Sequence, residues 1–485
     1  MTAKRPIRKD SGLVHWMNEV PKEADKAADG FDNEAVHDLR VALRRCRSMA
    51  DGFRAIDPHK DWKRMRRQAT ALFDTFGALR DCHVTTEWTQ KLGQADDPVT
   101  LQLLKHLGEQ EAELEQQAKS AADVFDRKQW QSWTRQLGQR ARRLPLGSHV
   151  FQVLALEKLI AARRLEAPAL KWGNAMAFHK LRIALKKFRY VVENFLPQQH
   201  HEWRAGLKDI QDLLGEIHDL DVLRGTVLSV CASADPAALQ RWEKAVAAER
   251  LQRIKHYSEV MVGDRSLWRV WRSALPQGKA ARAASLKKLQ AWSAFMDSDL
   301  QHNRRVARFA VQIHDSLAHH GMLKGARNSC ELLKAAAMVH EVGRFAGNKN
   351  HHKNTQRMVN KLDAIVGWTR QEVTTMASVA RYHRGALPQA SRLQDIPIAQ
   401  RKTMMLLAGI LRLANALDDE HDGQIKRIKV SHHANYILIQ AQGLRQDSML
   451  AEKIAASRHL LEINCNLPIL VRPMPNRTPP RRTLS

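Results

Sequence analysis

One segment occurs twice in this sequence, and its repetition limits the folds that the chain can adopt. Residues 37–47 read HDLRVALRRCR, and 142 residues later, at 179–189, the chain reads HKLRIALKKFR. A shorter match, Arg80-Asp81 against His218-Asp219, is displaced by 138 residues and fits the same duplication. Because two separate segments repeat at nearly one spacing, we expect two similar structural units rather than one repeated helix.

Hydrophobic periodicity predicts a mainly α-helical chain. Apolar residues recur at helical spacing from residue 12 to about 292, with breaks expected at Pro58, Pro98, Pro168 and Pro276. A second helical stretch runs from 293 to 419, then 425–430 and 436–440 read as a β-hairpin, and 448–463 reads as a last helix. We therefore expect repeats at about 12–145 and 150–292, a further domain at 293–468, and a basic, Pro-rich, disordered tail at 469–485.

Each copy of the repeated segment gathers basic side chains on one side of its helix. At about 100° per residue, the basic positions of each copy fall within an arc of about 80°. We call them the first basic ridge (His37, Arg40, Arg44, Arg47) and the second basic ridge (His179, Arg182, Lys186, Arg189). The opposite sides are apolar, with Leu39, Leu43, Cys46, Ala50 and Phe53 in the first copy and Leu181, Leu185, Phe188, Val192 and Phe195 in the second. Each helix is therefore expected to bury one side and expose the other.

The ridges do not mix charges of opposite sign, as solvated helix faces usually do. Like charges at neighbouring helical positions cost a few tenths of a kcal/mol per pair, unless an anion neutralises them. The chain as a whole carries a formal net charge of +27, which favours a polyanionic partner. Arginine can bind phosphate oxygens through two hydrogen bonds, and so phosphate is the expected target. The candidate contacts are His37, Arg40, Arg44, Arg45, Arg47, Lys63, Arg66, Arg67, Arg80, His179, Arg182, Lys186, Lys187, Arg189 and Lys208.

The duplicated pattern of a histidine followed by basic residues, with a later Arg-Asp pair, resembles the CHAD domain, the conserved-histidine α-helical domain. The resemblance covers about 12–292. It implies two pseudo-symmetric helical bundles that bind inorganic polyphosphate in a basic central pore. His218 stands where the first copy has Arg80, which removes one cation from the second copy.

The histidines of the C-terminal half allow a metal site. His302, His340, Glu341 and Asp418 have the order of the His, His-Asp and Asp ligands of His-Asp phosphohydrolases, which use divalent metal ions. Glu341 replaces the aspartate, and its extra methylene would move the carboxylate from the usual ligand position. A site for Mg²⁺ or Mn²⁺, with His340 and Glu341 catalytic, is therefore an alternative and not the leading expectation.

The same region closely resembles the C-terminal part of the exopolyphosphatase/guanosine pentaphosphatase (Ppx/GppA) family. The motifs are the apolar run ending in His340-Glu341, the pair His351-His352, and Val379-Ala-Arg-Tyr-His383-Arg384. The resemblance implies an HD-like fold that helps to bind a phosphate chain, while the family's catalytic actin-like domain has no counterpart in the sequence. The candidate phosphate contacts are His340, His351, His352, Lys353, Arg381, His383 and Arg384, and the alternative for His340 and Glu341 is a purely structural role.

Three functions remain open at this point. The leading function is polyphosphate binding, with the C-terminal domain as an accessory binding module. Under this hypothesis the protein is not expected to be an enzyme. The alternatives are a metal-dependent HD-type phosphohydrolase acting on polyphosphate or a phosphorylated nucleotide, and a nucleic-acid-binding protein. Five scattered cysteines, no signal peptide and no membrane span favour the cytoplasm, with polyphosphate granules as a further possible location.

Overall fold

The computed structural model describes residues 12–30, 33–296, 299–323, 326–362, 365–445 and 448–475. The chain forms two compact units, Met1–Ala284 and Ser285–Ser485. Along the chain, the boundary between the units lies within helix α11 (Gly278–Met296), a few residues before the boundary predicted at 292. The boundary lies earlier because Leu289 and Trp292 of α11 belong to the hydrophobic core of the second unit.

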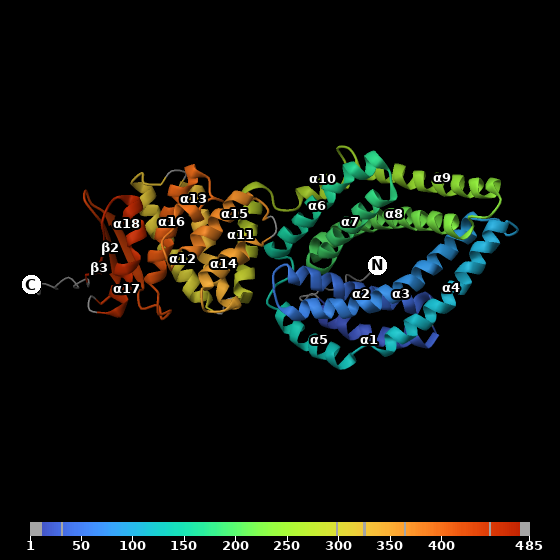
Figure 1. The fold of residues 1–485 in the computed structure, drawn as a ribbon, viewed down its shortest axis with the longest axis horizontal. Helices are drawn as coiled ribbons and strands as arrows, with labels where there is room; N and C mark the ends of the chain where they lie inside the picture. The colour runs from blue at the N-terminus through green and yellow to red at the C-terminus, as the bar shows by residue number, and fades with distance from the viewer. Residues whose placement is uncertain are drawn as a thin grey trace, which may run out of the picture. The chain divides into compact units, whose positions relative to one another are not determined.

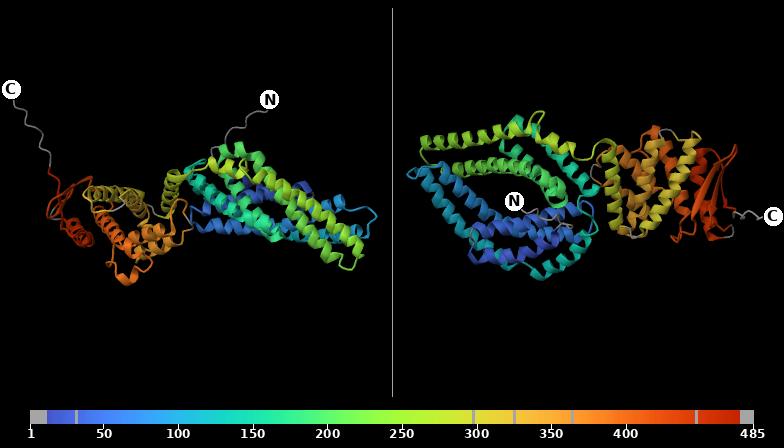
Figure 2. Two further views of the ribbon diagram at one scale, coloured as in Figure 1. Left: turned by 90° about the horizontal axis from the view of Figure 1, so that it is seen from above. Right: turned by 180° about the vertical axis from the view of Figure 1, so that it is seen from behind.

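The N-terminal unit contains both copies of the repeat (Figure 1). The first copy forms α1 (Leu13–Gly30), α2 (Asn33–Arg54), α3 (Lys60–Leu92), α4 (Pro98–Asp123) and α5 (Arg127–Ala141). The second copy forms α6 (His149–Trp172), α7 (Ala175–Phe195), α8 (Pro197–Val230), α9 (Pro236–Met261) and α10 (Leu267–Ser273). Figures 1 and 2 show the two copies as two groups of helices, coloured blue to cyan and green, with α2 and α3 in one and α7 and α8 in the other. The expected mainly α-helical class is confirmed.

Pro168 does not end its helix, contrary to the sequence prediction. It lies inside α6, which continues to Trp172. A proline inside a helix removes one backbone hydrogen bond but does not always stop the helix. The helix ends instead at Gly173, whose φ of 61° lies in the left-handed region and whose N–H donates to the Ala169 carbonyl.

The apolar sides of the repeated helices are buried as predicted. The ten apolar residues expected on these sides are all 0–5% exposed. Helices α2 and α7 contact each other, so the two bundles pack against one another through these helices. Phe195 of α7 stacks on Phe151, with ring centroids 4.2 Å apart, and meets the Phe53 ring of α2 edge-on at 5.1 Å.

Gly52 is required where α2 passes Phe195. A Cβ atom at this position would lie 2.3 Å from the Phe195 ring, which is itself held between Phe53 and Phe151. We expect Gly52→Ala to lower the free energy of unfolding by about 1–3 kcal/mol, because the ring has no room to move. Gly108→Ala in α4 is the matched control, since its Cβ would meet no atom within 4 Å. Urea unfolding of both variants tests this, and an unchanged stability in Gly52→Ala would contradict the described packing.

The second unit is a helical domain with a small sheet. After α11 its helices are α12 (Leu300–His319), α13 (Ala326–Val339), the 3-10 helix η1 (Val342–Ala346), α14 (His351–Asn360), α15 (Arg370–Arg381), the 3-10 helix η2 (Ala390–Arg392), α16 (Ile398–Ala416), α17 (Met449–Ser457) and α18 (His459–Cys465). Helix α16 contacts α12, α13, α15, α17 and α18, and most of its residues from Leu406 to Ala416 are buried. This helix therefore forms the centre of the second core.

The sheet contains the predicted hairpin and one further strand. Strands β1 (Arg427–His432) and β2 (Ile437–Gln442) pair antiparallel, and β3 (Ile469–Pro473) pairs parallel to β2 on its other edge. The predicted disordered tail is therefore wrong at its start, because Ile469 is fully buried and its N–H donates to the Glu462 carboxylate at 2.9 Å. The remainder of that predicted tail, from 476, lies outside the described residues.

In the part of the chain that the structure describes, no helix is both long enough and apolar enough to cross a membrane.

Candidate functional site

The first basic ridge lies on α2 and rests against α3. The Arg40 guanidinium lies 4.6 Å from the centre of the Phe73 ring and donates to the Phe73 carbonyl at 3.4 Å. A Cβ on residue 77 would come within 2.7 Å of Arg40 Nη1, so Gly77 leaves space for this side chain. Arg47 covers the same Phe73 ring at 4.1 Å. The ridge is therefore held by a partly buried aromatic platform instead of extending freely into water.

The second basic ridge lies on α7 and comes close to the first. Burial, together with the positive charges of Arg182 and Arg44, lowers the pKa of Lys186 to about 7. Arg40 also lies close enough to lower it, and both Arg40 and Arg44 belong to the other copy of the repeat. The two ridges therefore converge, and burial together with the positive charges of both copies disfavours the charged form of Lys186.

The duplicated aspartates lie among these cations. Burial raises the pKa of Asp219 to about 6, and the negative charge of Asp81 from the other copy adds to this, while Arg182 opposes it. Burial lowers the pKa of Arg182, and the negative charges of Asp219 and Asp81 oppose this lowering. The Arg-Asp and His-Asp pairs are visible in the sequence, but the two aspartates were not predicted to belong to the site. The recurrence of Asp81 as Asp219 in the second copy was the sequence feature that could have indicated their place in the site.

His218 is the uncharged counterpart of Arg80. Burial, with the nearby charges of Arg182 and His179, lowers the pKa of His218 to about 4. Its ring lies beside that of His179, with centroids 5.1 Å apart. At neutral pH the second copy therefore has one cation fewer than the first.

Several buried polar atoms of the second ridge have no partner among the described residues. Arg182 Nε and Arg189 Nη1 lack a hydrogen-bond acceptor, and Gln211 Oε1 on α8 lacks a donor. All three residues line one small cavity between α7 and α8, together with Lys186. Unpartnered guanidinium groups are costly, which is typical of a site that an anion or water completes.

Other predicted contacts are partly committed to the protein itself. Arg45 pairs with Glu193 and donates to Asn194 at 3.0 Å, so it joins α2 to α7. Arg66 pairs with Asp51 at 2.6 Å, Arg80 with Glu87 at 3.3 Å and Lys208 with Asp212 at 3.3 Å. The predicted contacts whose side chains are exposed are His37, Lys63, Arg67, Lys187 and Lys208. The structure thus brings Arg40, Arg44, Arg182 and Lys186 together as the centre of the site.

The second unit contains a buried cluster of histidines around one carboxylate. Glu341 Oε1 lies 3.3 Å from His351 Nε2 and 3.3 Å from His383 Nε2. Burial alone would raise the pKa of Glu341, but the contacts with His351 and His383 hold it below its ordinary value. Burial, with the charge of His383, lowers the pKa of His340 to about 3, and burial also lowers that of His383. Burial therefore favours the neutral forms of His340 and His383 beside this anion.

Asp418 does not join this cluster as a metal ligand. Arg305 Nε donates to its two oxygens at 2.9 and 2.8 Å, His302 Nδ1 lies 2.8 Å from Oδ2, and the Gly423 N–H donates to Oδ1 at 3.1 Å. The charge of Arg305 thus occupies the place that a metal ion would take beside Asp418. Among the described residues, the possible ligand groups of this region are His302 with His340 and Glu341, and Glu341 with His351 and His383. Asp418 lies outside both groups, although it is bonded to His302.

The predicted C-terminal phosphate contacts divide into buried and accessible ones. His340, His351 and His383 are 0%, 4% and 1% exposed and face Glu341 or one another. These three are not available to a phosphate chain at the surface. Lys353 and Arg384 are exposed, and His352 is half-buried.

A second group of cations surrounds the accessible contacts. Arg381 Nη1 and Arg412 Nη1 are buried without a hydrogen-bond partner in the described chain. Arg412 donates to the Gly385 carbonyl at 2.5 Å, and the His352 ring lies against Gly385. Burial, followed by the charge of Arg381, lowers the pKa of His352 to about 4. Arg412 was not predicted from the sequence, because it lies on α16 and outside the histidine motifs.

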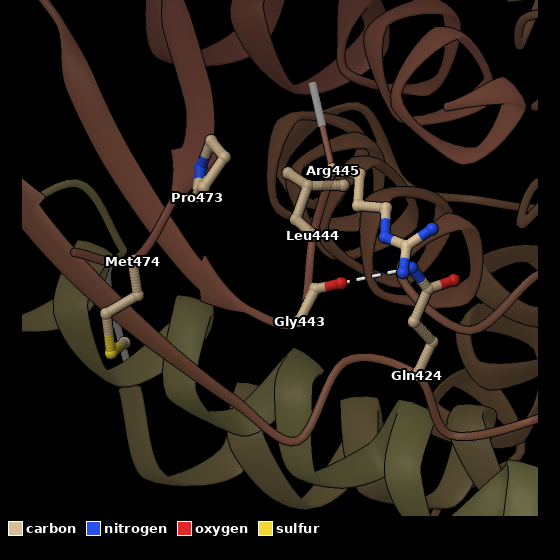
Figure 3. A pocket seen from close by; sticks show the side chains of 6 residues that line it. All are labelled: Gln424, Gly443, Leu444, Arg445, Pro473 and Met474. Atoms are coloured by element: carbon tan, nitrogen blue, oxygen red, sulfur yellow. Dashed lines mark hydrogen bonds between the residues drawn. The ribbon is translucent and has the colours of Figure 1, made fainter. Parts of the chain in front are cut away.

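A surface pocket lies elsewhere, beside the sheet (Figure 3). Gln424, Gly443, Leu444, Arg445, Pro473 and Met474 line it. Gln424 Nε2 donates to the Gly443 carbonyl at 3.0 Å across its rim. Arg445 is the one charged residue of this lining, and the pocket shares no residue with the ridges or the histidine cluster. We assign no function to it.

Comparison with known proteins identifies both parts of the chain. Residues 17–228 match the family model of the CHAD domain, and residues 281–457 match that of the Ppx/GppA phosphatase, domain III. Among solved structures, the chain is similar to the crystal structure of the CHAD domain from the plant Ricinus communis, with 22% sequence identity and a TM-score of 0.39. That match covers 56% of this chain and 96% of the plant chain.

Proposed function

From a chain that carries a CHAD domain at residues 17–228 and a Ppx/GppA phosphatase domain III at 281–457, we propose that the protein binds inorganic polyphosphate. The observation that carries the proposal is the convergence of the two basic ridges, where Arg40 and Arg44 lower the pKa of Lys186 from the other copy. Like charges held close together in a partly buried site are destabilising in the free protein. A polyanion would relieve this repulsion and restore the charge of Lys186.

The geometry of the ridge suits phosphate better than a single carboxylate. Arg182 Nε and Arg189 Nη1 are buried, unpartnered donors beside one cavity. The cavity has room for about one water, so these two atoms are not themselves phosphate contacts. Phosphate oxygens can accept from several guanidinium groups at once, which suits the arginines of the two ridges. Base stacking is not favoured, because Arg40 and Arg47 cover the Phe73 ring of the first ridge.

The second unit would provide an accessory contact to the same phosphate chain. The residues that remain accessible for this role are Lys353 and Arg384, with His352, Arg381 and Arg412 behind them. Linking two weak sites in one chain raises the overall affinity for a long polymer without any new contact. We therefore expect long polyphosphate to bind more tightly than short oligophosphates.

One experiment separates the proposed function from its alternatives. Full-length protein is mixed with long-chain polyphosphate with and without Mg²⁺ or Mn²⁺, and both complex formation and released orthophosphate are measured. Tight, salt-sensitive binding without phosphate release supports a binding protein. Metal-dependent release that is lost in His340→Ala would show a hydrolase instead. Equal competition by single-stranded RNA, at the same phosphate concentration, would show a general nucleic-acid binder.

The lowered pKa of Lys186 gives the binding a specific pH dependence. In the free protein Lys186 loses its proton near pH 7, whereas a bound polyanion raises its pKa. Above pH 7 the complex therefore holds more protons than the free protein. The affinity for polyphosphate then falls as pH rises, by at most about tenfold per pH unit. Titrations at pH 6.0, 7.0 and 8.5 measure this fall. Lys186→Arg keeps its charge and should remove this part of the dependence, and an identical profile in that variant would contradict the assignment.

The location in the cell is also part of the proposal. All five cysteines are free thiols, which suits a reducing compartment such as the cytoplasm. Polyphosphate granules would provide long chains of the expected ligand there.

A further inference from the structure

A further group of metal-ligating side chains lies where α12 packs against α13. It joins His314 and Asp315 of α12 with Cys330 of α13, and one ligand atom from each residue lies within 4.8 Å of the other two. Among the described residues, it is the one group of three or more possible ligands that includes a thiol. His314 follows His302 by twelve residues of the same helix, about 18 Å along its axis. The group is therefore separate from the buried histidines at the other end of α12.

The Asp315 carboxylate lies between an imidazole nitrogen and a sulfur atom. His314 Nδ1 is 3.0 Å from Asp315 Oδ1, and Cys330 Sγ is 4.0 Å from the same oxygen. Neighbouring residues of a helix point about 100° apart, so the Asp315 side chain has to turn back to reach the His314 ring. His314 is 1% exposed, whereas the Asp315 side chain is 64% exposed. A buried ligand thus meets one that solvent and ions can reach.

The spacing of these atoms is close to that of a tetrahedral metal site. Bonds of about 2.0–2.2 Å to nitrogen and oxygen and about 2.3 Å to sulfur place N and O about 3.4 Å apart and S and O about 3.6 Å apart. The observed distances are 3.0 and 4.0 Å. Moving the exposed carboxylate by a few tenths of an ångström, from His314 toward Cys330, brings both distances closer to these values. No helix has to move.

Ser329 holds the His314 ring from its other side. His314 Nε2 lies 2.9 Å from Ser329 Oγ, and both residues are buried. In the free protein Nδ1–H can donate to Asp315 while the hydroxyl donates to Nε2. The hydroxyl can also rotate and accept from Nε2–H, which leaves the lone pair of Nδ1 facing Asp315. The same bond therefore orients the ring in both states, as the outer contacts of metal-binding histidines do.

The thiol brings in the preference for the metal. Burial raises the pKa of Cys330, the charge of Lys334 opposes this, and the charges of Asp315 and Glu331 add to it. On binding, the metal ion replaces the thiol proton, which goes to solvent, and the imidazole carries its single proton on Nε2. A thiolate, an imidazole and a carboxylate suit Zn²⁺ and similar ions, whereas Mg²⁺ and Ca²⁺ prefer oxygen ligands alone.

We propose that His314, Asp315 and Cys330 bind one divalent ion of the Zn²⁺ class, with water as the fourth ligand. The ion links α12 to α13, which supply two ligands and one ligand respectively. Because the site is partly exposed and has no bound substrate, its role is to fasten these helices. The proposal does not depend on polyphosphate binding, and either can fail without the other.

The test uses reduced full-length protein, freed of metal with a chelator and titrated with Co²⁺ as a spectroscopic substitute for Zn²⁺. We expect a near-ultraviolet charge-transfer band from thiolate to Co²⁺, which added Zn²⁺ removes. Ions held only by histidines and carboxylates cannot give this band. Cys330→Ser should abolish it. Asp315→Ala should weaken Co²⁺ binding, followed on this band, by more than about 100-fold, since the loss of an outer contact alone costs 10- to 100-fold.

Cys465→Ser is the matched control, because Cys465 is the other partly exposed free thiol of the second unit. It should keep the band and bind Co²⁺ within about threefold of the wild type, and circular dichroism checks the fold of each variant. A band that persists in Cys330→Ser, or that both serine variants reduce equally, would place the ion elsewhere and overturn the proposal. Unchanged affinity in Asp315→Ala, or no band in the folded wild type, would also overturn it.

Discussion

Removing four cations from the centre of the two basic ridges is expected to weaken polyphosphate binding about 100-fold or more at physiological salt. The four substitutions are Arg40→Ala, Arg44→Ala, Arg182→Ala and Lys186→Ala. Each neutralised phosphate releases counterions, so the slope of log K against log salt should also become shallower by about 3. Fluorescence titration with long-chain polyphosphate, from 50 to 300 mM salt, measures both quantities.

A matched control removes the same charge from other faces of the N-terminal unit. Arg164, Lys171, Arg241 and Arg269 are exposed and lie on α6, α9 and α10. Their fourfold alanine variant has the same formal net charge as the ridge variant, with Lys186 counted as charged. If both variants lose the same affinity, binding depends on total charge, and the ridges are not the site.

The largest effect on stability is expected from Asp57, which is fully buried in the loop between α2 and α3. Arg140 of α5 donates to both of its oxygens, at 2.5 and 2.6 Å, and Trp62 Nε1 donates at 2.8 Å. Asp57→Ala removes the buried carboxylate that both donors bind and should cost about 3–5 kcal/mol. Asp25→Ala is the control, since Asp25 makes a similar two-bond pair with Arg127 at the surface and should cost less than about 1 kcal/mol.

Acid should remove the contribution of Asp57. Burial alone would raise its pKa, but the hydrogen bonds from Arg140 and Trp62 hold the pKa below the ordinary value of 3.8. The stabilisation is therefore fully present above about pH 4 and is lost as pH falls through the lowered pKa of the folded state. Urea unfolding at pH 7 and pH 3 should show the wild type and Asp57→Ala converging in acid. A constant difference would mean that the charge of Asp57 is not what stabilises the loop.

The N-terminal fold could be predicted because its signals are periodic and duplicated. The spacing of Leu39, Leu43 and Phe53 identified the buried side of α2, and repetition at 179–189 identified its partner. The roles of individual arginines could not be predicted in the same way. Arg44 and Arg45 are neighbours in sequence, yet Arg45 pairs with Glu193 of α7, a contact that depends on how the two copies pack.

The C-terminal site was less predictable because its motifs give an order of residues but not their partners. Asp418 was grouped with His302 and His340 as a metal ligand, whereas Arg305, one helical turn beyond His302, neutralises it. His351 and His383 were expected to reach phosphate, but the close approach at Gly343 turns His351 inward. The additional strand had a visible signal, the apolar run Ile469-Leu-Val, which the following proline-rich sequence obscured.

The parallel strand β3 has a practical consequence for solubility. Strand β2 lies in the middle of the sheet, and β3 covers its second edge. A chain shortened after Leu467 would leave that edge open, with Ile437, Ile439 and Ala441 along the exposed strand. Open, apolar strand edges pair readily with other chains. Truncation of a segment that resembles a dispensable tail would thus leave an unpaired strand edge as a starting point for aggregation.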